Sequence, residues 1–123
     1  MSYQLPRIFG ILKMRNESAI LKDTLDSWSQ FCTGGIYIVD DVSSDNSVNI
    51  ACAHPNVINV QVATVWDRDR EKAEWYLRQM ALTRAQKDAG PDDWFVYFDC
   101  DEFLEDFTDF ELFDTSKAIA CRL

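Results

Sequence analysis

The residues best suited to chemistry are two aspartates, Asp99 and Asp101, which follow an apolar run at residues 94–98 of this 123-residue chain. A buried strand is the expected structure for such a run. If the extended backbone continues, both carboxylates lie on one face, with Cys100 on the other. Two close carboxylates repel each other unless a cation lies between them or one is protonated. Because Mg²⁺ and Mn²⁺ are typically held by one or two carboxylates, water and phosphates, the pair predicts a divalent-metal site. A solvated acidic turn is the alternative.

A second D-x-D triplet, at residues 67–69, has a simpler explanation. It opens a predicted helix, where Asp67 and Asp69 would cap the first turn and complement the helix dipole. The triplet alone is therefore uninformative, and its position after a strand is what gives Asp99 and Asp101 their interest.

Strand-like and helix-like segments alternate along the chain. The predicted strands are 8–13, 36–39, 57–66 and 94–98, and the predicted helices are 18–31, 46–53 and 69–89, with Ala73, Leu77, Met80, Ala81, Arg84 and Ala85 along one side of the last. This order indicates an α/β fold with a parallel, doubly wound sheet. In such sheets, ligands bind beyond the carboxyl ends of the strands. The polar segments that follow the strands are therefore expected to form one cleft.

Several charged side chains follow these strands. Arg15 and Glu17 come after the first strand, and Asp40 and Asp41 end the second. A carboxylate there can accept hydrogen bonds from a base N–H or from ribose hydroxyls, although Asp40 could instead begin a turn that caps the next helix. No G-x-G-x-x-G or Walker-type motif is present, so a phosphate would have to be met by a metal and by basic side chains. The candidates for that role are Arg15, Arg68, Arg70 and Arg78.

Composition limits the partners. A net charge of −9 and a pI near 4.4 oppose sequence-independent binding to nucleic acid or to an anionic membrane surface. The sequence contains no apolar run of about 20 residues and no secretory signal, which predicts a cytoplasmic domain without a transmembrane segment. The four cysteines are widely spaced and are expected to be buried free thiols. The single histidine, His54, has no partner in the sequence that would make it a base or a ligand, so a structural role is expected.

Four blocks of sequence, in this order, resemble the GT-A-fold, family-2-like glycosyltransferases. They are Arg15-Asn16-Glu17, residues 39–45 (V-D-D-V-S-S-D), Arg78-Gln79, and residues 98–103 (F-D-C-D-E-F). In that family the second block commonly reads V-D-D-x-S-x-D, and one branch carries D-x-D-E-F. The resemblance spans about residues 8–105. It implies a Rossmann-like GT-A nucleotide-binding sheet, mostly parallel, with helices on both faces.

The resemblance also implies an activity. It suggests a metal-dependent enzyme that takes a sugar from a nucleotide-diphosphate sugar and transfers it to a hydroxyl of a glycan or other acceptor, with Mn²⁺ or Mg²⁺ as cofactor. By position, the nucleotide-sugar contacts would be Arg15, Glu17, Asp40, Asp41, Arg78 and Asp99, and the metal ligands Asp101 and Asp99. Asp41 matches the acid that contacts the base. Arg78 matches the arginine of an Arg-Asn pair whose asparagine is replaced here by Gln79.

The chain departs from the family in length. The family's acceptor-side half, which usually carries the general base, follows the D-x-D motif, so residues 1–123 are expected to form a single donor-binding domain that is incomplete at its C-terminus. A stand-alone nucleotide-sugar-binding module without catalysis is the main alternative. A haloacid dehalogenase-type phosphatase fits less well, because its D-x-D usually follows the first strand. The apolar strand predicted from Lys117 onward would leave an exposed sheet edge, through which two copies could associate.

Overall fold

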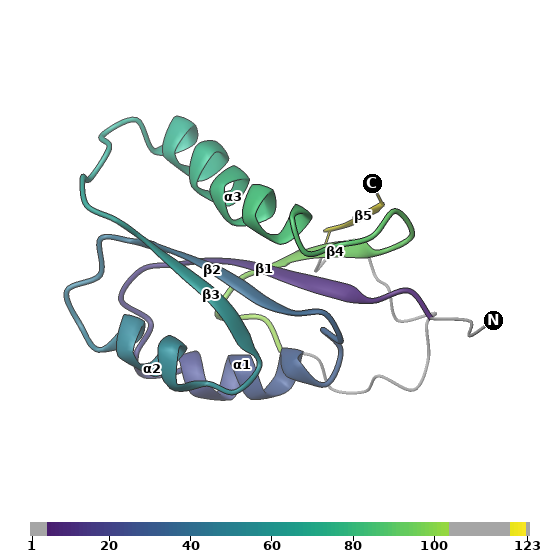
Figure 1. The fold of residues 1–123 in the computed structure, drawn as a ribbon. Helices are drawn as coiled ribbons and strands as arrows, with labels where there is room; N and C mark the ends of the chain where they lie inside the picture. The colour runs from purple at the N-terminus through teal and green to yellow at the C-terminus, as the bar shows by residue number, and fades with distance from the viewer. Residues whose placement is uncertain (1–4, 104–118, 123) are drawn as a thin grey trace.

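A five-stranded sheet lies between helices on its two faces (Figure 1). The computed structural model describes residues 5–103 and 119–122, the last four by their backbone alone. The elements, in chain order, are β1 (Ile8–Met14), α1 (Leu21–Ser29), β2 (Gly35–Asp41), α2 (Ser47–Ala53), β3 (Val57–Ala63), α3 (Arg70–Gln86), β4 (Trp94–Phe98) and β5 (Ile119–Arg122). The strand predicted at 94–98 is confirmed at both ends.

The strands lie in the order β3-β2-β1-β4-β5. The first four are parallel, and β5 runs antiparallel to β4. The central strand is β1, in which Ile11 pairs with Tyr37 of β2 on one side and with Tyr97 of β4 on the other. The predicted α/β class with a mostly parallel, doubly wound sheet is therefore confirmed. Because the chain fills one side of β1 and then crosses to the other, the strand order reverses between β1 and β4, which is where such sheets bind ligands.

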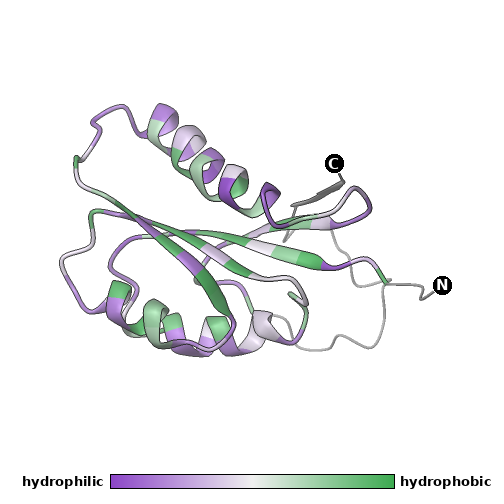
Figure 2. Ribbon diagram, viewed as in Figure 1, coloured by the Kyte–Doolittle hydropathy of each residue, from purple (hydrophilic) through white to green (hydrophobic). Residues whose placement is uncertain are grey.

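Each face of the sheet has its own core. On one face Leu25 and Trp28 of α1 pack against Leu12, Ile38 and Phe98, and the Trp28 and Phe98 rings stack with centroids 4.3 Å apart. Figure 2 shows the strands as largely hydrophobic and the outward sides of the helices as mixed or hydrophilic. This division is expected when a sheet is covered on both sides.

The core of the other face is built by α3. Four apolar side chains at intervals of four residues face the sheet: Ala73, Leu77, Ala81 and Ala85. Met80, which was predicted to lie on the same side, is instead 38% exposed. Because the buried side chains of α3 recur every four residues, they form a narrow stripe along the helix. Met80, which precedes Ala81, lies outside this stripe and points toward solvent.

Some element boundaries differ from those predicted. β3 ends at Ala63 rather than at residue 66. α1 begins at Leu21 rather than at residue 18, because the carbonyl of Glu17 first accepts hydrogen bonds from the amides of Ile20 and Leu21 in a tight turn. Lys117, Ala118 and Leu123 of the predicted last strand lie outside the described residues.

The expectation that all four cysteines are buried needs correction. Cys32 and Cys100 are buried, and burial raises the pKa of both thiols, that of Cys100 to about 12, but Cys52 is exposed near the end of the short helix α2. The side chain of Cys121 lies outside the described part of the structure. The Nε2 of His54 lies 2.8 Å from Oδ1 of Asp26 on α1. This contact joins the end of α2 to α1. In the part of the chain that the structure describes, no helix is long and apolar enough to cross a bilayer.

Candidate functional site

The loops that follow β1, β2 and β3 gather at one end of the sheet, on the left in Figure 1, and the turn after β4 joins them. We call this end the carboxyl rim; it comprises residues 15–18, 42–46, 64–69 and 99–102. All the residues predicted to bind nucleotide or metal lie in this rim, at the end of β2, or, for Arg70 and Arg78, on α3. The rim is therefore the candidate site.

The loops after β1 and β2 are tied together by Asn16. Its Oδ1 accepts a hydrogen bond from the amide of Ser44 at 2.7 Å, and the amide of Glu17 donates to Oγ of Ser47 at 2.9 Å. Asn16 has φ 52°, a left-handed conformation that asparagine tolerates, and Val42 has φ 58°, which is costly for a β-branched residue. These contacts hold the Glu17 backbone in place.

The two acids at the end of β2 have different environments. Asp40 is fully buried, and its two oxygens accept from the amide of Ser43 at 2.9 Å and from the Ser43 hydroxyl at 2.5 Å. These contacts match the turn-forming alternative for Asp40. Asp41 is 1% exposed and forms an ion pair with Arg70 from the start of α3. A ligand could therefore reach the Asp41 carboxylate only if the Arg70 side chain moved.

Trp66 stands beside this ion pair. The Cζ atoms of Arg15 and Arg70 lie 4.2 Å and 3.5 Å from the centre of its ring, and a guanidinium this close to an indole is a favourable cation–π contact. The ring is 43% exposed. Trp66 was not singled out from the sequence, although an aromatic residue at the end of the third predicted strand was a usable signal. It links Arg15, after β1, to Arg70 and Asp41.

The Asp99–Asp101 pair lies on a turn rather than on an extended strand. β4 stops at Phe98, and the amide of Glu102 donates to the carbonyl of Asp99 at 3.0 Å. The Glu102 side chain closes the turn from the other side, because its Oε1 accepts from the Asp99 amide at 2.9 Å. The expected extended geometry is therefore wrong. The side chains of Asp99 and Asp101 are nevertheless exposed, and that of Cys100 is buried.

Helix α1 anchors this turn from below. The Thr24 hydroxyl, which is fully buried, donates to the carbonyl of Cys100. The indole Nε1 of Trp28 donates to the carbonyl of Glu102 at 2.8 Å. Two buried side chains thus hold the backbone on either side of Asp101, and neither was identified from the sequence as a support of this turn.

Arg78 joins α3 to the turn. Its Nη2 lies 2.6 Å from Oδ1 of Asp99 and its Nε lies 2.5 Å from Oε1 of Glu74, while Lys13 of β1 contacts the other Glu74 oxygen at 2.9 Å. Burial by itself would lower the pKa of Arg78, but the hydrogen bonds to Glu74 and Asp99 outweigh it and raise the pKa. The structure thus places Arg78 against a predicted site residue, and it adds Glu74, which was not predicted.

Carboxylates from three loops approach one another across the point where the strand order reverses. The pKa of Glu17 is raised, first by partial burial and then by the negative charges of Asp101, Asp45 and Asp99. Glu17 follows β1, and Asp99 and Asp101 follow β4, so part of the rise in pKa comes from negative charges at a neighbouring strand end. The pKa of Glu102 is raised in the same way, by burial and then by Asp99 and Asp101.

The predicted residues fall into two neighbouring groups. Asp41 lies with Arg15, Arg70 and Trp66, and Glu17 lies with Asp99, Asp101 and Arg78. Arg15 and Glu17 connect them, since only Asn16 separates the two. Asp40 belongs to neither, because both its oxygens are bound to Ser43.

The carboxylates of the rim can be tested for their fit to a divalent metal ion. Within residues 5–103, no three acidic, cysteine or histidine side chains come together as a complete metal cage. Asp99 and Asp101 provide the one or two carboxylates with which proteins usually hold Mg²⁺ or Mn²⁺, the other ligands being water and phosphate oxygens. The donor set therefore fits such an ion together with a diphosphate.

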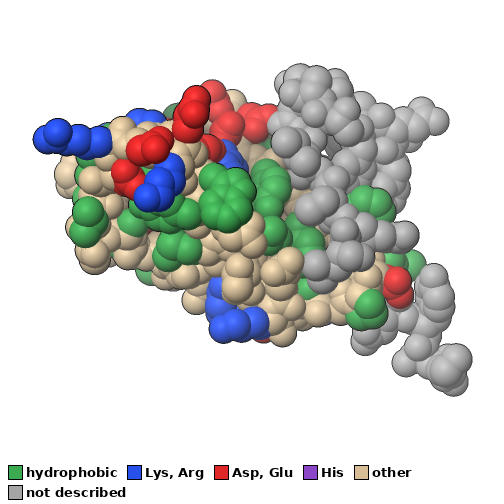
Figure 3. Space-filling view, turned by 90° about the horizontal axis from the view of Figure 1, so that it is seen from above, with side chains coloured by type: hydrophobic (Ala, Val, Ile, Leu, Met, Phe, Trp, Pro, Cys, Tyr) green, Lys and Arg blue, Asp and Glu red, His purple; other side chains and the backbone are tan. Residues whose placement is uncertain are grey.

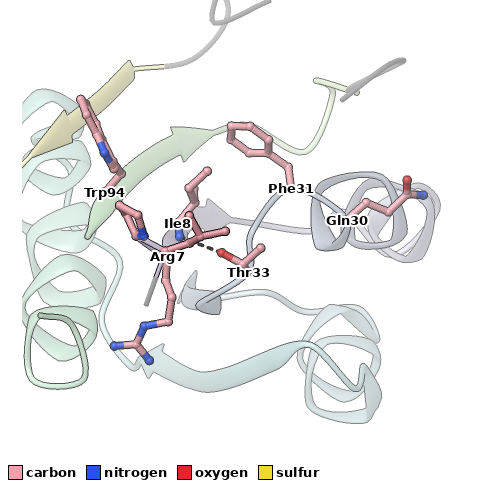
Figure 4. A pocket seen from close by; sticks show the side chains of 8 residues that line it. Arg7, Ile8, Gln30, Phe31, Thr33 and Trp94 are labelled. Carbon is pink, nitrogen blue, oxygen red and sulfur yellow. Dashed lines mark hydrogen bonds between the residues drawn. The ribbon is translucent and has the colours of Figure 1, made fainter. Parts of the chain in front are cut away.

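A separate apolar pocket of about 490 Å³ lies at the opposite end of the sheet. Figure 4 shows Ile8, Phe31 and Trp94 around it, with the Arg7 side chain at its edge and the Ile8 amide bound to Oγ1 of Thr33. We call this end, formed by residues 5–7, 30–34 and 88–93, the amino rim. None of the predicted site residues lies there.

Comparison with known proteins gives relatives but no activity. No family model matches the chain. It is 32% identical over 109 residues, or 86% of its length, to the uncharacterized protein Mb3815c of Mycobacterium bovis and equally to the uncharacterized protein Rv3786c of Mycobacterium tuberculosis. The chain spans only 25% of the length of each of these relatives.

Proposed function

We propose that the carboxyl rim binds a nucleoside diphosphate sugar together with Mg²⁺ or Mn²⁺, and that the chain is the donor-binding part of a glycosyltransferase. The resemblance of four sequence blocks to the family-2-like glycosyltransferases suggested this function. One observation from the structure supports it most: Glu17, which follows β1, and Asp99 and Asp101, which follow β4, flank the reversal of strand order between these two strands. Ligands of open α/β sheets bind at such points.

The geometry suggests a role for each group. Asp41 would accept a hydrogen bond from the base once Arg70 has moved, and Trp66 offers an aromatic surface beside it. Arg15 would meet the negative charge of the diphosphate. Arg78 already holds Asp99 in position. Asp101, with Asp99, would hold the metal, which when bound stabilises the negative charge of the departing diphosphate.

Titration calorimetry with UDP, GDP and dTDP, each with and without Mn²⁺, tests the proposal. We expect one of the three to bind in a metal-dependent way. Asp101→Asn should weaken that binding by at least about tenfold, because it removes a charged ligand. Asp92→Asn is the matched control, since Asp92 is an exposed acid of the amino rim, and it should leave binding unchanged.

Two outcomes separate the alternatives. Metal-dependent binding followed by transfer from the matching nucleotide sugar would support the enzyme, whereas binding without transfer would favour a nucleotide-sugar-binding module. Absence of binding to all three nucleotides, with the protein folded by circular dichroism, would contradict the proposal.

A further inference from the structure

Strand β3 forms an edge of the sheet with little protection. One of its sides pairs with β2, and in the described residues no strand pairs with the other. Edge strands expose unpaired N–H and C=O groups, and proteins usually protect them with charges, prolines or bulges. Residues 57–66 contain no charged residue, no proline and no glycine. The one irregularity in pairing lies at the start of the strand, so residues 59–63 form a regular ladder with β2.

Exposed apolar side chains concentrate beside this edge. Ile58 and Val62 of β3 are 51% and 50% exposed, and Val65 just beyond them is 73% exposed. On the neighbouring helix α3, Trp75 is 68% exposed and Met80 is 38% exposed. Figure 3, which looks onto the face covered by α3, shows apolar side chains at the surface beside charged ones. Single exposed apolar residues are ordinary, but a group of them along one edge indicates a contact surface.

A hollow of about 330 Å³ separates β3 from the outer side of α3. Gln61 contributes to it from the strand, and Trp75, Met80 and Thr83 contribute from the helix. Trp75 and Met80 therefore lie on the side of α3 that looks along the β3 edge. A partner seated on the edge would meet these side chains as well as the strand backbone.

The distribution of charge indicates which partner fits. The chain carries 12 basic and 21 acidic residues, a net charge of −9, yet residues 46–66 contain no lysine, arginine, aspartate or glutamate. Two copies of so acidic a chain repel each other over most of their surface. The β3 edge lies within the uncharged stretch, so a second copy can approach the strand without that cost, and the charged residues that line the neighbouring hollow, Arg84 and Lys87, are basic in a chain that is acidic overall.

We propose that β3 pairs antiparallel with β3 of a second copy across a two-fold axis. If the axis passes beside Val60, Ile58 lies opposite Val62 of the other copy, so the exposed apolar positions are self-complementary, as a two-fold interface requires. The two sheets become one continuous sheet. Because the axis is perpendicular to the sheet, the two α3 helices lie on the same face, with Trp75 and Met80 toward the partner. This inference is independent of the proposed nucleotide site.

Sedimentation equilibrium of the chain over a wide range of concentrations measures the assembly directly. We expect a dimer of twice the 14.2 kDa chain mass. Val62→Lys places a charge on each side of the pair and should raise the dissociation constant at least about tenfold, which corresponds to about 1.4 kcal/mol. Trp75→Glu tests the helix part of the surface and should weaken the dimer as well. Leu5→Lys changes a residue that is 78% exposed on the amino rim and should leave the dimer intact.

Two results would overturn the proposal. One is a monomer at every concentration, and the other is a dimer that survives both Val62→Lys and Trp75→Glu. Circular dichroism of each variant shows whether it has folded. Hydrogen exchange gives a second readout, because the outward amides of β3 should exchange more slowly as the concentration rises and should lose this protection in Val62→Lys.

Discussion

The two ends of the sheet handle charge in opposite ways. At the amino rim, Asp93 accepts hydrogen bonds from the amides of Arg7 at 2.8 Å and Gly90 at 2.7 Å, and its carboxylate lies 3.1 Å from the Arg7 guanidinium. Burial alone would raise the pKa of Asp93, but these contacts outweigh it and lower the pKa. The arrangement joins the start of β1 to the start of β4.

At the carboxyl rim the acids outnumber the arginines that pair with them. Asp41 and Asp99 each have an arginine, but the pKa of Glu17 is raised, first by partial burial and then by the negative charges of Asp101, Asp45 and Asp99. The charged form of Glu17 therefore gains no stability from its surroundings. The contrast indicates that Asp93 helps to hold the sheet together at the amino rim, whereas the surroundings of Glu17 at the carboxyl rim disfavour its charged form.

The largest difference in stability is expected between amide substitutions of an acid at each rim, Asp93 at the amino rim and Asp101 at the carboxyl rim. Asp93→Asn leaves the Gly90 amide and the Arg7 guanidinium without their charged acceptor, and we expect it to lower the free energy of unfolding by about 2 kcal/mol. Asp101→Asn, in an exposed side chain of the carboxyl rim, should change it by less than about 0.5 kcal/mol. Urea unfolding of the two variants measures the difference.

This comparison would fail if Asp101→Asn destabilised the fold as much as Asp93→Asn does. In that case Asp101 would be part of the framework and not a side chain free to bind a ligand. A loss of metal-dependent nucleotide binding without a loss of stability would instead sharpen the division between the rims.

A smaller loss of stability is expected from replacing Thr24, which supports the carboxyl rim, with Thr33 of the amino rim as the matched control. Thr24→Val keeps the shape of the buried side chain but removes the hydroxyl that donates to the Cys100 carbonyl, which should cost about 1 kcal/mol. It should also weaken metal-dependent nucleotide binding, because the Asp99–Glu102 turn loses an anchor. Thr33→Val, at the exposed amino rim, removes the acceptor of the Ile8 amide, but water can replace it. We therefore expect Thr33→Val to leave both properties nearly unchanged, as measured by urea unfolding and calorimetry; equal losses in the two variants would contradict the assigned role of Thr24.

The fold could be predicted from local patterns because the core follows them. The five apolar residues of β4 end directly at Asp99, and the spacing of four in α3 gives its buried stripe. The turn at Asp99–Asp101 could not be predicted from the sequence, because it depends on the Glu102 side chain, whose carboxylate accepts a hydrogen bond from the Asp99 amide. Such a contact competes with the strand and leaves no periodic signal.

The residues that form the candidate site could be predicted only in part from the sequence. The position of a charged residue after each strand was enough to bring Glu17, Asp99 and Asp101 to one rim, since parallel strands end on the same side. The ion pair between Arg70 and Asp41 could not be predicted, because it joins the end of β2 to the start of α3, and these two segments are distant in sequence. Asp40 and Asp41 look alike in the sequence, yet alternation across the strand places them on opposite faces, where Ser43 binds one and Arg70 the other.

The smallest predicted effect concerns the sign of pH dependence at the carboxyl rim. The pKa of Glu17 is raised in the folded chain, so folding becomes less favourable as pH rises from the unfolded value of about 4.3 through the folded value. Glu17→Gln should therefore raise the melting temperature slightly at pH 7, and this gain should disappear on acidification below about pH 4. Asp93, whose pKa is lowered, has the opposite sign: its stabilising contribution is present at neutral pH and is lost as pH falls through its folded pKa, so Asp93→Asn is less stable than the parent at pH 7. Melting curves by circular dichroism across this pH range test both signs. A Glu17→Gln variant that melts lower than the parent at pH 7 would mean that Glu17 is paired like Asp93, and the contrast between the two rims would no longer hold.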